Sequence, residues 1–238
     1  MLNEQQAYER LAEAYTTLGW APDAKAWSSL VAYWQWLQKW NQAFNLTAIR
    51  DPEQMLIKHV FDSMVVVPYL TGRDMRQSNP NVQTLRCPSL LDVGTGAGLP
   101  GLVVAILCPE CQVFLLDSNS KKTRFLQQVK THLTLDNVTV LHQRVESHQP
   151  KHGYDVIVSR AFANVKDFLT LTAPLLAADG SWWAMKSQKI NAELESLPSF
   201  AKIQQLYTLA VPCLQAHRVL VQLVPAAETA ESAPRNRT

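Results

Sequence analysis

The architecture of this chain can be inferred from one segment, Leu90-Leu91-Asp92-Val93-Gly94-Thr95-Gly96-Ala97-Gly98-Leu99-Pro100-Gly101, which is followed at once by apolar helical residues 102–107. A short apolar strand leads into an acid and then into closely spaced glycines, which let the backbone turn tightly against a ligand. This order of strand, glycine turn and helix is typical of a nucleotide-type cofactor site at the carboxyl end of a parallel sheet. The segment therefore predicts an α/β fold with a cofactor at the turn.

Two classes of cofactor match these glycines. Residues 96–101 fit the G-x-G-x-x-G pattern of dinucleotide sites, whereas Asp92-x-Gly94-x-Gly96-x-Gly98 is the pattern of S-adenosylmethionine sites. A dinucleotide places its pyrophosphate on the N–H groups of the first helical turn, and Pro100 removes one of these donors. The carboxylate of Asp92 suits an ammonium and a sulfonium better than phosphates. The residues favour S-adenosylmethionine, and the alternatives are a dinucleotide or a tight turn that binds nothing.

The chain alternates between strand-like and helical segments from residue 89 onward. This alternation predicts a doubly wound α/β sheet, with helices that include 120–133 and 165–176. The last two strands are expected to form an antiparallel pair. The expected strands are 89–93, 112–117, 138–142, 154–159, 181–186, 203–210 and 217–223.

Apolar residues before this sheet recur at helical spacing. Residues 2–18 form the first expected helix. The third is expected to start at Pro52, with Asp51 as its N-cap, and to run to about Tyr69. Between them, apolar residues mark one helical face, which predicts a helical bundle docked on a larger domain; RNA stacking by an exposed ring is the alternative. That face consists of Trp27, Leu30, Val31, Trp34 and Leu37.

Composition divides the chain into four expected parts. Residues 1–70 form an N-terminal helical region, and the polar, aperiodic residues 71–88 form a linker loop. Residues 89–224 form the sheet domain. The tail 225–238 is rich in Ala, Glu, Ser and Pro and is expected to be disordered.

Length and charge limit the class of protein. The 238 residues are 47% hydrophobic, but no apolar run approaches the ~20 residues that a membrane span needs. The first residues lack the basic and apolar regions of a signal peptide, so we expect a cytoplasmic protein without a membrane partner. The net charge of +2 means that a nucleic-acid partner requires a local basic patch.

The cysteines do not suggest a metal centre. Cys108-Pro109-Glu110-Cys111 has the spacing of a metal or redox pair, but no second pair completes a zinc site. This pair is expected to close a helix rather than open one, unlike redox motifs. We therefore expect no metal and interpret Cys108 and Cys111 as buried, inert thiols. No disulfide framework is expected from the four cysteines, which are Cys87, Cys108, Cys111 and Cys213.

Several charged residues follow expected strands, where ligands bind in open α/β sheets. Asp117 ends the second strand and could hold ribose hydroxyls. The alternative interpretations are a solvated loop acid for Glu146, a structural ion pair for Arg160, and a surface or packing role for Lys186. By position alone, the candidates are Asp92, Asp117, Glu146, Arg160 and Lys186.

Segments spread over most of the chain agree with one known family. They are Asn45 to Pro52, His59-Val60-Phe61-Asp62-Ser63, the glycine segment, Leu116 to Leu126, Val158 to Ala163, and Ala184-Met185-Lys186. Together, over about residues 2–223, they resemble the bacterial small-subunit ribosomal RNA methyltransferase G family, also called glucose-inhibited division protein B. The linker 71–88 is longer than is usual in that family, and Ser187 replaces a common glycine.

The resemblance implies a Rossmann-like S-adenosylmethionine-dependent methyltransferase fold with a mostly parallel seven-stranded sheet. It also implies methylation of N7 of a guanine in 16S ribosomal RNA, with naked RNA or the 30S subunit as partner and a monomeric enzyme. Matching positions place Gly94, Leu99, Val145, Glu146 and Arg160 at the cofactor. The full expected cofactor set adds Asp92, Gly96, Gly98, Asp117 and Ser118.

The acceptor chemistry is consistent with a ring nitrogen. Guanine N7 has a free lone pair, so no general base is needed, and Arg160 is expected to position the reactants by binding O6 or a phosphate. The N-P-P-Y motif of exocyclic amine methylation is absent, and no cysteine follows the fourth strand as cytosine C5 methylation requires. A methyltransferase of proteins or small molecules and a non-catalytic RNA-binding assembly factor are the alternatives.

RNA contacts are expected from local basic groups and one aromatic ring. Phe162 could stack on the target base, with core packing as its alternative. The basic cluster after residue 120 could equally be a solvated helix face. The expected RNA-binding residues are Arg50, Lys58, His59, Lys121, Lys122, Arg124, Phe162 and Lys186.

Overall fold

The computed structural model describes residues 2–21, 23–76, 89–160, 162, 164–187, 191–216 and 218–226. Residues 77–88 of the predicted linker and 227–238 of the predicted tail lie outside this part of the chain. The described start of the linker packs closely: Thr71 is buried, and the Arg73 guanidinium lies 3.4 Å from the Glu110 carboxylate.

A seven-stranded sheet in the order β3-β2-β1-β4-β5-β7-β6 forms the centre of the fold. The first five of these strands run parallel, and β7 runs antiparallel to both of its neighbours. The prediction of a mostly parallel sheet with a closing antiparallel pair is confirmed. The strands are β1 (Ser89–Val93), β2 (Gln112–Asp117), β3 (Val138–His142), β4 (Tyr154–Ser159), β5 (Leu176–Ser187), β6 (Ala201–Leu209) and β7 (Arg218–Pro225).

Helices connect the strands and cover the sheet. The prediction for 120–133 is confirmed to the residue, whereas the helix predicted at 165–176 ends earlier and continues as a 3₁₀ turn, Ala173–Leu175. A second 3₁₀ turn spans Val145–Ser147. The helices after the first strand are α6 (Gly101–Leu107), α7 (Ser120–Leu133), α8 (Val165–Thr172) and α9 (Asn191–Leu194).

The N-terminal region is helical, as predicted, but its third helix is interrupted. Asp51 caps the start and Pro52 is the first helical residue, as expected, yet Leu56–Phe61 forms a π-helix. This wider turn inserts an extra residue into the helix, which shifts the side chains that follow it; such turns are frequent at functional sites. The other helices here are α1 (Glu4–Leu18), α2 (Ala24–Phe44), α3 (Pro52–Met55), α4 (Asp62–Met64) and α5 (Val67–Thr71).

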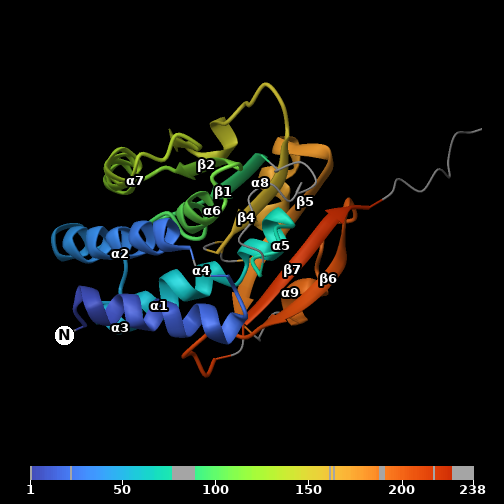
Figure 1. Cartoon of the computed structure of the whole chain (residues 1–238). Helices are drawn as coiled ribbons and strands as arrows, with labels where there is room; N and C mark the ends of the chain where they lie inside the picture. Colours follow the sequence, from blue (N-terminus) through green and yellow to red (C-terminus); the bar gives the residue numbers. More distant parts are fainter. Residues whose placement is uncertain are drawn as a thin grey trace, which may run out of the picture.

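One hydrophobic cluster joins the N-terminal helices to the sheet. It includes Leu11 of α1, Trp34 of α2, Phe125 of α7 and Leu220 of β7. Figure 1 shows α1 and α2 beside each other, with α6 and α7 next to α2. A second cluster, centred on Phe168 of α8, covers the other face of the sheet. The predicted apolar face of α2 is confirmed, because Leu30, Val31, Trp34 and Leu37 are buried and Trp27 is half-buried.

The strand order reverses between β1 and β4, and this position sets where a ligand can bind. In open α/β sheets the crevice outside the carboxyl ends of the strands at such a reversal is the usual binding site. Gly94 follows β1 and Arg160 follows β4. No helix in the described residues is long and apolar enough to cross a membrane.

Candidate active site at the carboxyl edge of the sheet

The glycine segment forms a tight loop between β1 and α6. Gly94, Gly96 and Gly98 have φ values of 67°, 61° and 90°, in the left-handed region that favours glycine. A Cβ atom on Gly98 would lie 2.3 Å from a methyl group of Leu102, so glycine is required for the loop to pack on α6. Gly98 thus shapes the loop.

Asp92 lies beneath this loop, completely buried. One carboxylate oxygen, Oδ2, accepts hydrogen bonds from the Thr95 hydroxyl (2.7 Å) and the Gly101 N–H (2.8 Å). Its other oxygen has no partner among the described residues. Burial raises the pKa of Asp92 to about 6, which still leaves the carboxylate ionised at neutral pH. Asp92 therefore places a negative charge under the loop, but it lines none of the cavities described below.

Asp117 holds the loop from the end of β2. Its Oδ2 atom accepts the Gly96 N–H at 2.9 Å, and its Oδ1 atom accepts the Asn119 N–H at 2.8 Å. The Lys122 ammonium lies 3.6 Å from Oδ2. Unlike Asp92, Asp117 also faces a cavity, so it can both fix the loop and contact a ligand.

The first cavity, which we call the β2–β3 cavity, has a volume of about 230 Å³. It brings together predicted cofactor residues from the ends of β1, β2 and β3, which lie next to one another in the sheet. Its walls combine apolar side chains with the Asp117 carboxylate. The lining residues are Val93, Gly94, Leu116, Asp117, Ser118, Gln143, Arg144, Val145, Glu146, Phe162 and Leu171.

The second cavity, the loop cavity, has a volume of about 180 Å³ and shares Gly94 with the first. The segment between α2 and the π-helix closes it opposite the glycine loop. The expected cofactor set contains no residue before Asp92, whereas Leu46, Thr47 and His59 of the N-terminal region line this cavity. The lining residues are Leu46, Thr47, His59, Gly94, Thr95, Gly96, Ala97, Leu99, Lys122 and Arg160.

The third cavity, the β5–β7 cavity, is the largest of the three at about 490 Å³. It shares His59 and Arg160 with the loop cavity, so the three cavities form a row along the carboxyl edge of the sheet. This volume lies within the usual range of ligand pockets. The lining residues are Ile49, Lys58, His59, Asp62, Arg160, Met185, Lys186, Glu193, Leu209, Arg218 and Val219.

His59 is a buried, neutral imidazole where the loop and β5–β7 cavities meet. Its Nδ1 atom lies 3.1 Å from the Lys58 carbonyl, and its Nε2 atom lies 2.7 Å from the Thr47 hydroxyl. A proton on Nδ1 satisfies the carbonyl and leaves Nε2 to accept from Thr47. Burial, together with the nearby Arg160 guanidinium, lowers the pKa of His59 to about 4. It therefore adds no positive charge to the site at neutral pH.

Asp62 joins two arginines in the β5–β7 cavity. This carboxylate is buried; its Oδ1 atom accepts from Arg218 Nε at 2.8 Å, and its Oδ2 atom lies 3.7 Å from Arg160 Nη1. Lys186, beside them, donates to the Glu193 carboxylate at 2.8 Å and to the Phe162 carbonyl at 3.1 Å. Arg160 thus takes part in an ion pair, as its alternative interpretation expects, and it also lines two cavities.

Some predicted RNA-binding residues lie apart from these cavities. Arg50, Lys121 and Arg124 are exposed and line none of the three, and Arg50 donates to the Asn45 side chain at 3.0 Å. Phe162 lines the β2–β3 cavity and packs against Phe168, with ring centroids 5.4 Å apart. This placement favours the packing alternative for Phe162 over stacking on a base in the β5–β7 cavity.

Several residues that line these cavities were not predicted from the sequence, among them the polar residues Thr47, Asp62, Glu193 and Arg218. Thr47 and Asp62 lie in segments that carried the family resemblance, so a signal existed, but nothing local indicated their contacts. Glu193 and Arg218 lie in no motif. The tertiary fold alone brings them to the site.

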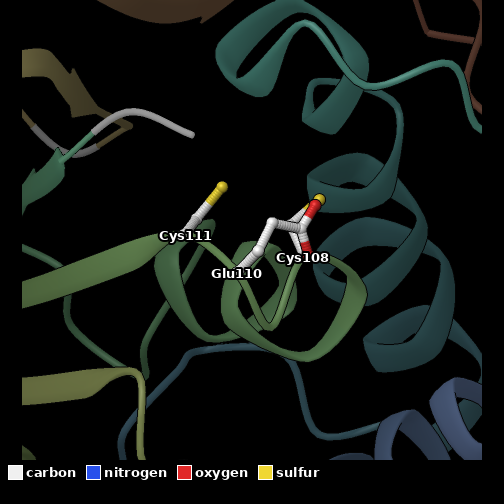
Figure 2. A group of neighbouring side chains, drawn as sticks. All are labelled: Cys108, Glu110 and Cys111. Atoms are coloured by element: carbon white, nitrogen blue, oxygen red, sulfur yellow. The ribbon is translucent and has the colours of Figure 1, made fainter. Parts of the chain in front are cut away.

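The cysteine pair lies away from this row of cavities. Donor atoms of Cys108, Glu110 and Cys111 lie within 4.8 Å of one another, and Figure 2 shows the three side chains at the turn between α6 and β2. Cys111, however, is disulfide-bonded, whereas Cys108 is a buried free thiol and Cys213 is free and exposed. The prediction of buried, inert thiols is therefore wrong for Cys111, which is buried but is not a free thiol. Sequence spacing could not show that Cys111 is disulfide-bonded.

Comparison with known proteins gives a consistent result. Residues 26–221 match the family described as rRNA small subunit methyltransferase G. A relative from Hydrogenovibrio crunogenus named "Ribosomal RNA small subunit methyltransferase G" is 49% identical over 228 residues, which cover 95% of this chain and 99% of the relative. A protein of the same name from Pseudomonas aeruginosa is 43% identical over 219 residues, which cover 92% and 96%.

A solved structure supports the fold. The "predicted O-methyltransferase, protein Atu636" from Agrobacterium tumefaciens superimposes with a TM-score of 0.54 at 17% identity. The match covers 70% of this chain and 82% of that protein. At this identity the likeness concerns the fold alone, and it agrees with the predicted Rossmann-like methyltransferase sheet.

Proposed function

The chain belongs to the rRNA small subunit methyltransferase G family, and from this premise we propose that it transfers a methyl group from S-adenosylmethionine to N7 of a guanine in 16S ribosomal RNA. The observation that carries the proposal is the row of three adjoining cavities. The first two suit a methyl donor, and the third suits an acceptor. The donor and the acceptor would meet at His59 and Arg160, which the last two cavities share.

The charges around the glycine loop fit S-adenosylmethionine better than a dinucleotide. Two cations line the loop cavity, and each faces a carboxylate: Lys122 lies 3.6 Å from Asp117, and Arg160 lies 3.7 Å from Asp62. Buried beneath the loop, the Asp92 carboxylate adds a negative charge. This balance favours an ammonium and a sulfonium over a pyrophosphate.

The residues that would hold the donor divide by role. When bound, S-adenosylmethionine supplies an electrophilic methyl group. The Asp117 carboxylate would accept from ribose hydroxyls, while the apolar walls of the β2–β3 cavity would enclose the adenine. The proposed set is Asp92, Gly94, Gly96, Gly98, Leu99, Asp117, Ser118, Val145, Glu146 and Arg160, in which Asp92 and Gly98 act by shaping the loop.

The acceptor side needs positioning rather than a base. Guanine N7 has no proton to lose, so holding the ring in line with the methyl group accounts for most of the catalysis. His59, whose pKa is held at about 4, is a weak base and adds no charge that would oppose a cationic product. Arg160 would bind the guanine O6 atom or a phosphate.

The target base must be unstacked to enter the β5–β7 cavity. Lys58 and Lys186 line this cavity, whereas Arg50, Lys121 and Arg124 would contact RNA outside it. We further propose that the protein acts as a monomer in the cytoplasm, on naked 16S RNA or on the 30S subunit.

Methyl transfer to ribosomal RNA tests the proposal directly. Purified protein is expected to label 16S RNA or 30S subunits from S-adenosylmethionine, and nucleotide-resolution mapping should find N7-methylguanine. Asp117→Ala should abolish labelling, whereas Asp136→Ala, which removes an exposed carboxylate outside the three cavities, should not. Transfer only to proteins or small molecules would contradict the RNA assignment. An absence of S-adenosylmethionine binding in calorimetry would instead indicate an assembly factor.

A further inference from the structure

The β5–β7 cavity carries an excess of positive charge. Its lining includes four cations (Lys58, Arg160, Lys186 and Arg218) but only two carboxylates (Asp62 and Glu193), which leaves two positive charges, because His59 is neutral. The β2–β3 cavity has no such excess, since its lining includes one cation, Arg144, and two carboxylates, Asp117 and Glu146. The ligand of the β5–β7 cavity is therefore expected to be anionic.

The two arginines keep free donors toward a ligand. Arg218 contacts Asp62 through Nε, and no partner is recorded among the described residues for its two terminal nitrogens. Arg160 makes its recorded contacts through Nη1, and the described residues include no partner for Nη2 or Nε. Both side chains are about a quarter exposed, at 28% for Arg160 and 27% for Arg218.

Asp62 anchors both guanidiniums. It is buried, and each of its oxygens faces a different arginine, one after β4 and one at the start of β7. Without this carboxylate, two like charges would repel each other across the cavity. A planar guanidinium held at one nitrogen can still offer two parallel N–H groups, which match the oxygens of a phosphate.

The order of the cavities separates the roles of the two arginines. Arg160 lines the loop cavity and the β5–β7 cavity, whereas Arg218 lines only the latter. A guanine that reaches the methyl donor would thus lie beside Arg160. Its sugar and phosphate would extend toward Arg218, where a positive charge does not oppose the charge that develops on the methylated base.

We propose that Arg218, anchored by Asp62, binds a phosphate group of the RNA strand that carries the target guanine, and that Arg160 completes this site. The inference rests on the proposed function, because it takes RNA as the acceptor. Asp62 acts as a positioning residue, since it touches the arginines rather than the RNA.

Two substitutions test the role of Arg218 while keeping a partner for Asp62. Arg218→Lys keeps the charge but loses the planar fork, and Arg218→Gln keeps an amide donor but loses the charge. Both should raise the KM for RNA by roughly 10- to 100-fold, the range for hydrogen bonds to a charged group. The Kd for S-adenosylmethionine should stay within about twofold of wild type, because Arg218 lines neither of the proposed cofactor cavities.

The salt dependence of RNA binding gives a readout that is independent of methyl transfer. In fluorescence anisotropy with a single-stranded fragment of 16S RNA, Arg218→Gln should lower the slope of log K against log salt by about 0.7, the value for one phosphate contact. Lys202→Gln is the matched control. It removes one exposed charge from β6, outside the cavities, and should leave slope and KM unchanged.

The outcomes separate this inference from the proposed function. Wild-type RNA affinity in both Arg218 variants would overturn the phosphate site, as would an equal change in Lys202→Gln. If the Kd for the cofactor rises as much as the KM for RNA, Arg218 has a structural role, and the phosphate site is also overturned. RNA binding that depends on Arg218 without methyl transfer would contradict the proposed function alone. A wild-type protein that binds no RNA would contradict both.

Discussion

The cofactor side and the acceptor side of the site are built in different ways. The cofactor side is built mainly from a loop and three strand ends between residues 92 and 146, which are held by bonds to backbone N–H groups; Thr47, His59 and Arg160 also line its loop cavity. Charged side chains form the contacts of the acceptor side, which joins Ile49, Lys58, His59, Asp62, Arg160, Lys186, Glu193 and Arg218. Backbone shape should therefore control cofactor binding, and ion pairs should control RNA binding.

Gly98→Ala is expected to have the largest effect, and it acts on the cofactor side. The new Cβ atom would lie 2.3 Å from Leu102 at a φ of +90°, so the loop must move. We expect an increase of about 100-fold or more in the Kd for S-adenosylmethionine, which corresponds to roughly 3 kcal/mol. Isothermal titration calorimetry measures this Kd directly.

Gly19→Ala is the control, because it has a similar backbone strain without a clash. Gly19 has a φ of +65° and no neighbouring atom within 4 Å of an added Cβ. This variant should lose about 1 kcal/mol of stability and keep its cofactor affinity. If the two alanine variants bind the cofactor equally well, backbone shape does not control the cofactor side.

The pH dependence of stability should show opposite contributions from the two sides. The pKa of His59 is lowered from 6.5 to about 4, so its neutral form stabilises the fold above pH 6.5, and this contribution is lost as the pH falls toward 4. The pKa of Asp92 is raised from 3.8 to about 6, so its contribution is largest below pH 3.8 and is lost as the pH rises to 6. Each shift corresponds to about 3 kcal/mol, and between pH 4 and 6 the two oppose each other.

Single substitutions should reveal each contribution. Asp92→Asn removes the acid, so acidification from pH 6.5 to 4 should cost about 3 kcal/mol more than in wild type. His59→Gln should shift the dependence in the opposite direction. Urea unfolding at several pH values measures the free energy of unfolding of wild type and of both variants. If the three proteins show the same dependence of this free energy on pH, neither group titrates as described.

The fold was largely predictable because its signals are local. The bounds of β1 to β4 match the predicted ranges to the residue, since each strand is a short, largely apolar run between polar segments. The start of β5 at Leu176 was missed, because Asp179-Gly180 has the composition of a turn. The π-helix at Leu56–Phe61 was missed because its apolar spacing is also that of an α-helix.

The site was predictable only in part, for a physical reason. Glycine conformations and strand-end acids leave a local pattern, so the residues around Gly94 and Asp117 could be found. An ion pair such as Asp62 with Arg218 joins residues 156 positions apart, and the sequence around each residue does not indicate its partner. Asp92 was selected as a cofactor residue, but its complete burial beneath the loop was not predicted.

Asp62→Asn should act mainly on the acceptor side. The amide keeps the volume but loses the charge that anchors both arginines, so the KM for RNA should rise about tenfold. The cofactor Kd should change by less than about twofold. Measuring both constants in one preparation tests whether the two sides are separable.

Asp155→Asn controls for lost stability, because Asp155 also accepts hydrogen bonds, from the Ser89 N–H at 2.9 Å and hydroxyl at 2.8 Å, but lies outside the three cavities. It should lower stability and leave both constants unchanged. An RNA KM that rises equally in both variants would assign the effect to general destabilisation and contradict a specific role for Asp62.

Tyr33→Phe is expected to have the smallest effect, and it tests how the helical region supports the cofactor side. Tyr33 is buried on α2, and its hydroxyl donates to the Ala97 carbonyl in the glycine loop at 2.7 Å. Burial raises the pKa of this phenol, so it remains a donor at all ordinary pH values. Phenylalanine keeps the ring and loses one hydrogen bond, which should cost about 1 kcal/mol of stability and weaken cofactor binding about threefold.

Tyr154→Phe is the matched variant, because its hydroxyl bonds to His148 at 2.8 Å, away from the glycine loop. It should lose similar stability without a change in the cofactor Kd. A specific effect of Tyr33 would mean that the N-terminal helices help to set the shape of the loop, so that the cofactor side, too, depends on a contact between residues 64 positions apart. Equal cofactor affinities in the two variants would instead mean that the glycines and acids of the loop determine its shape. The shape of the glycine loop would then depend on residues close in the sequence, whereas the acceptor side depends on contacts between residues far apart in the sequence.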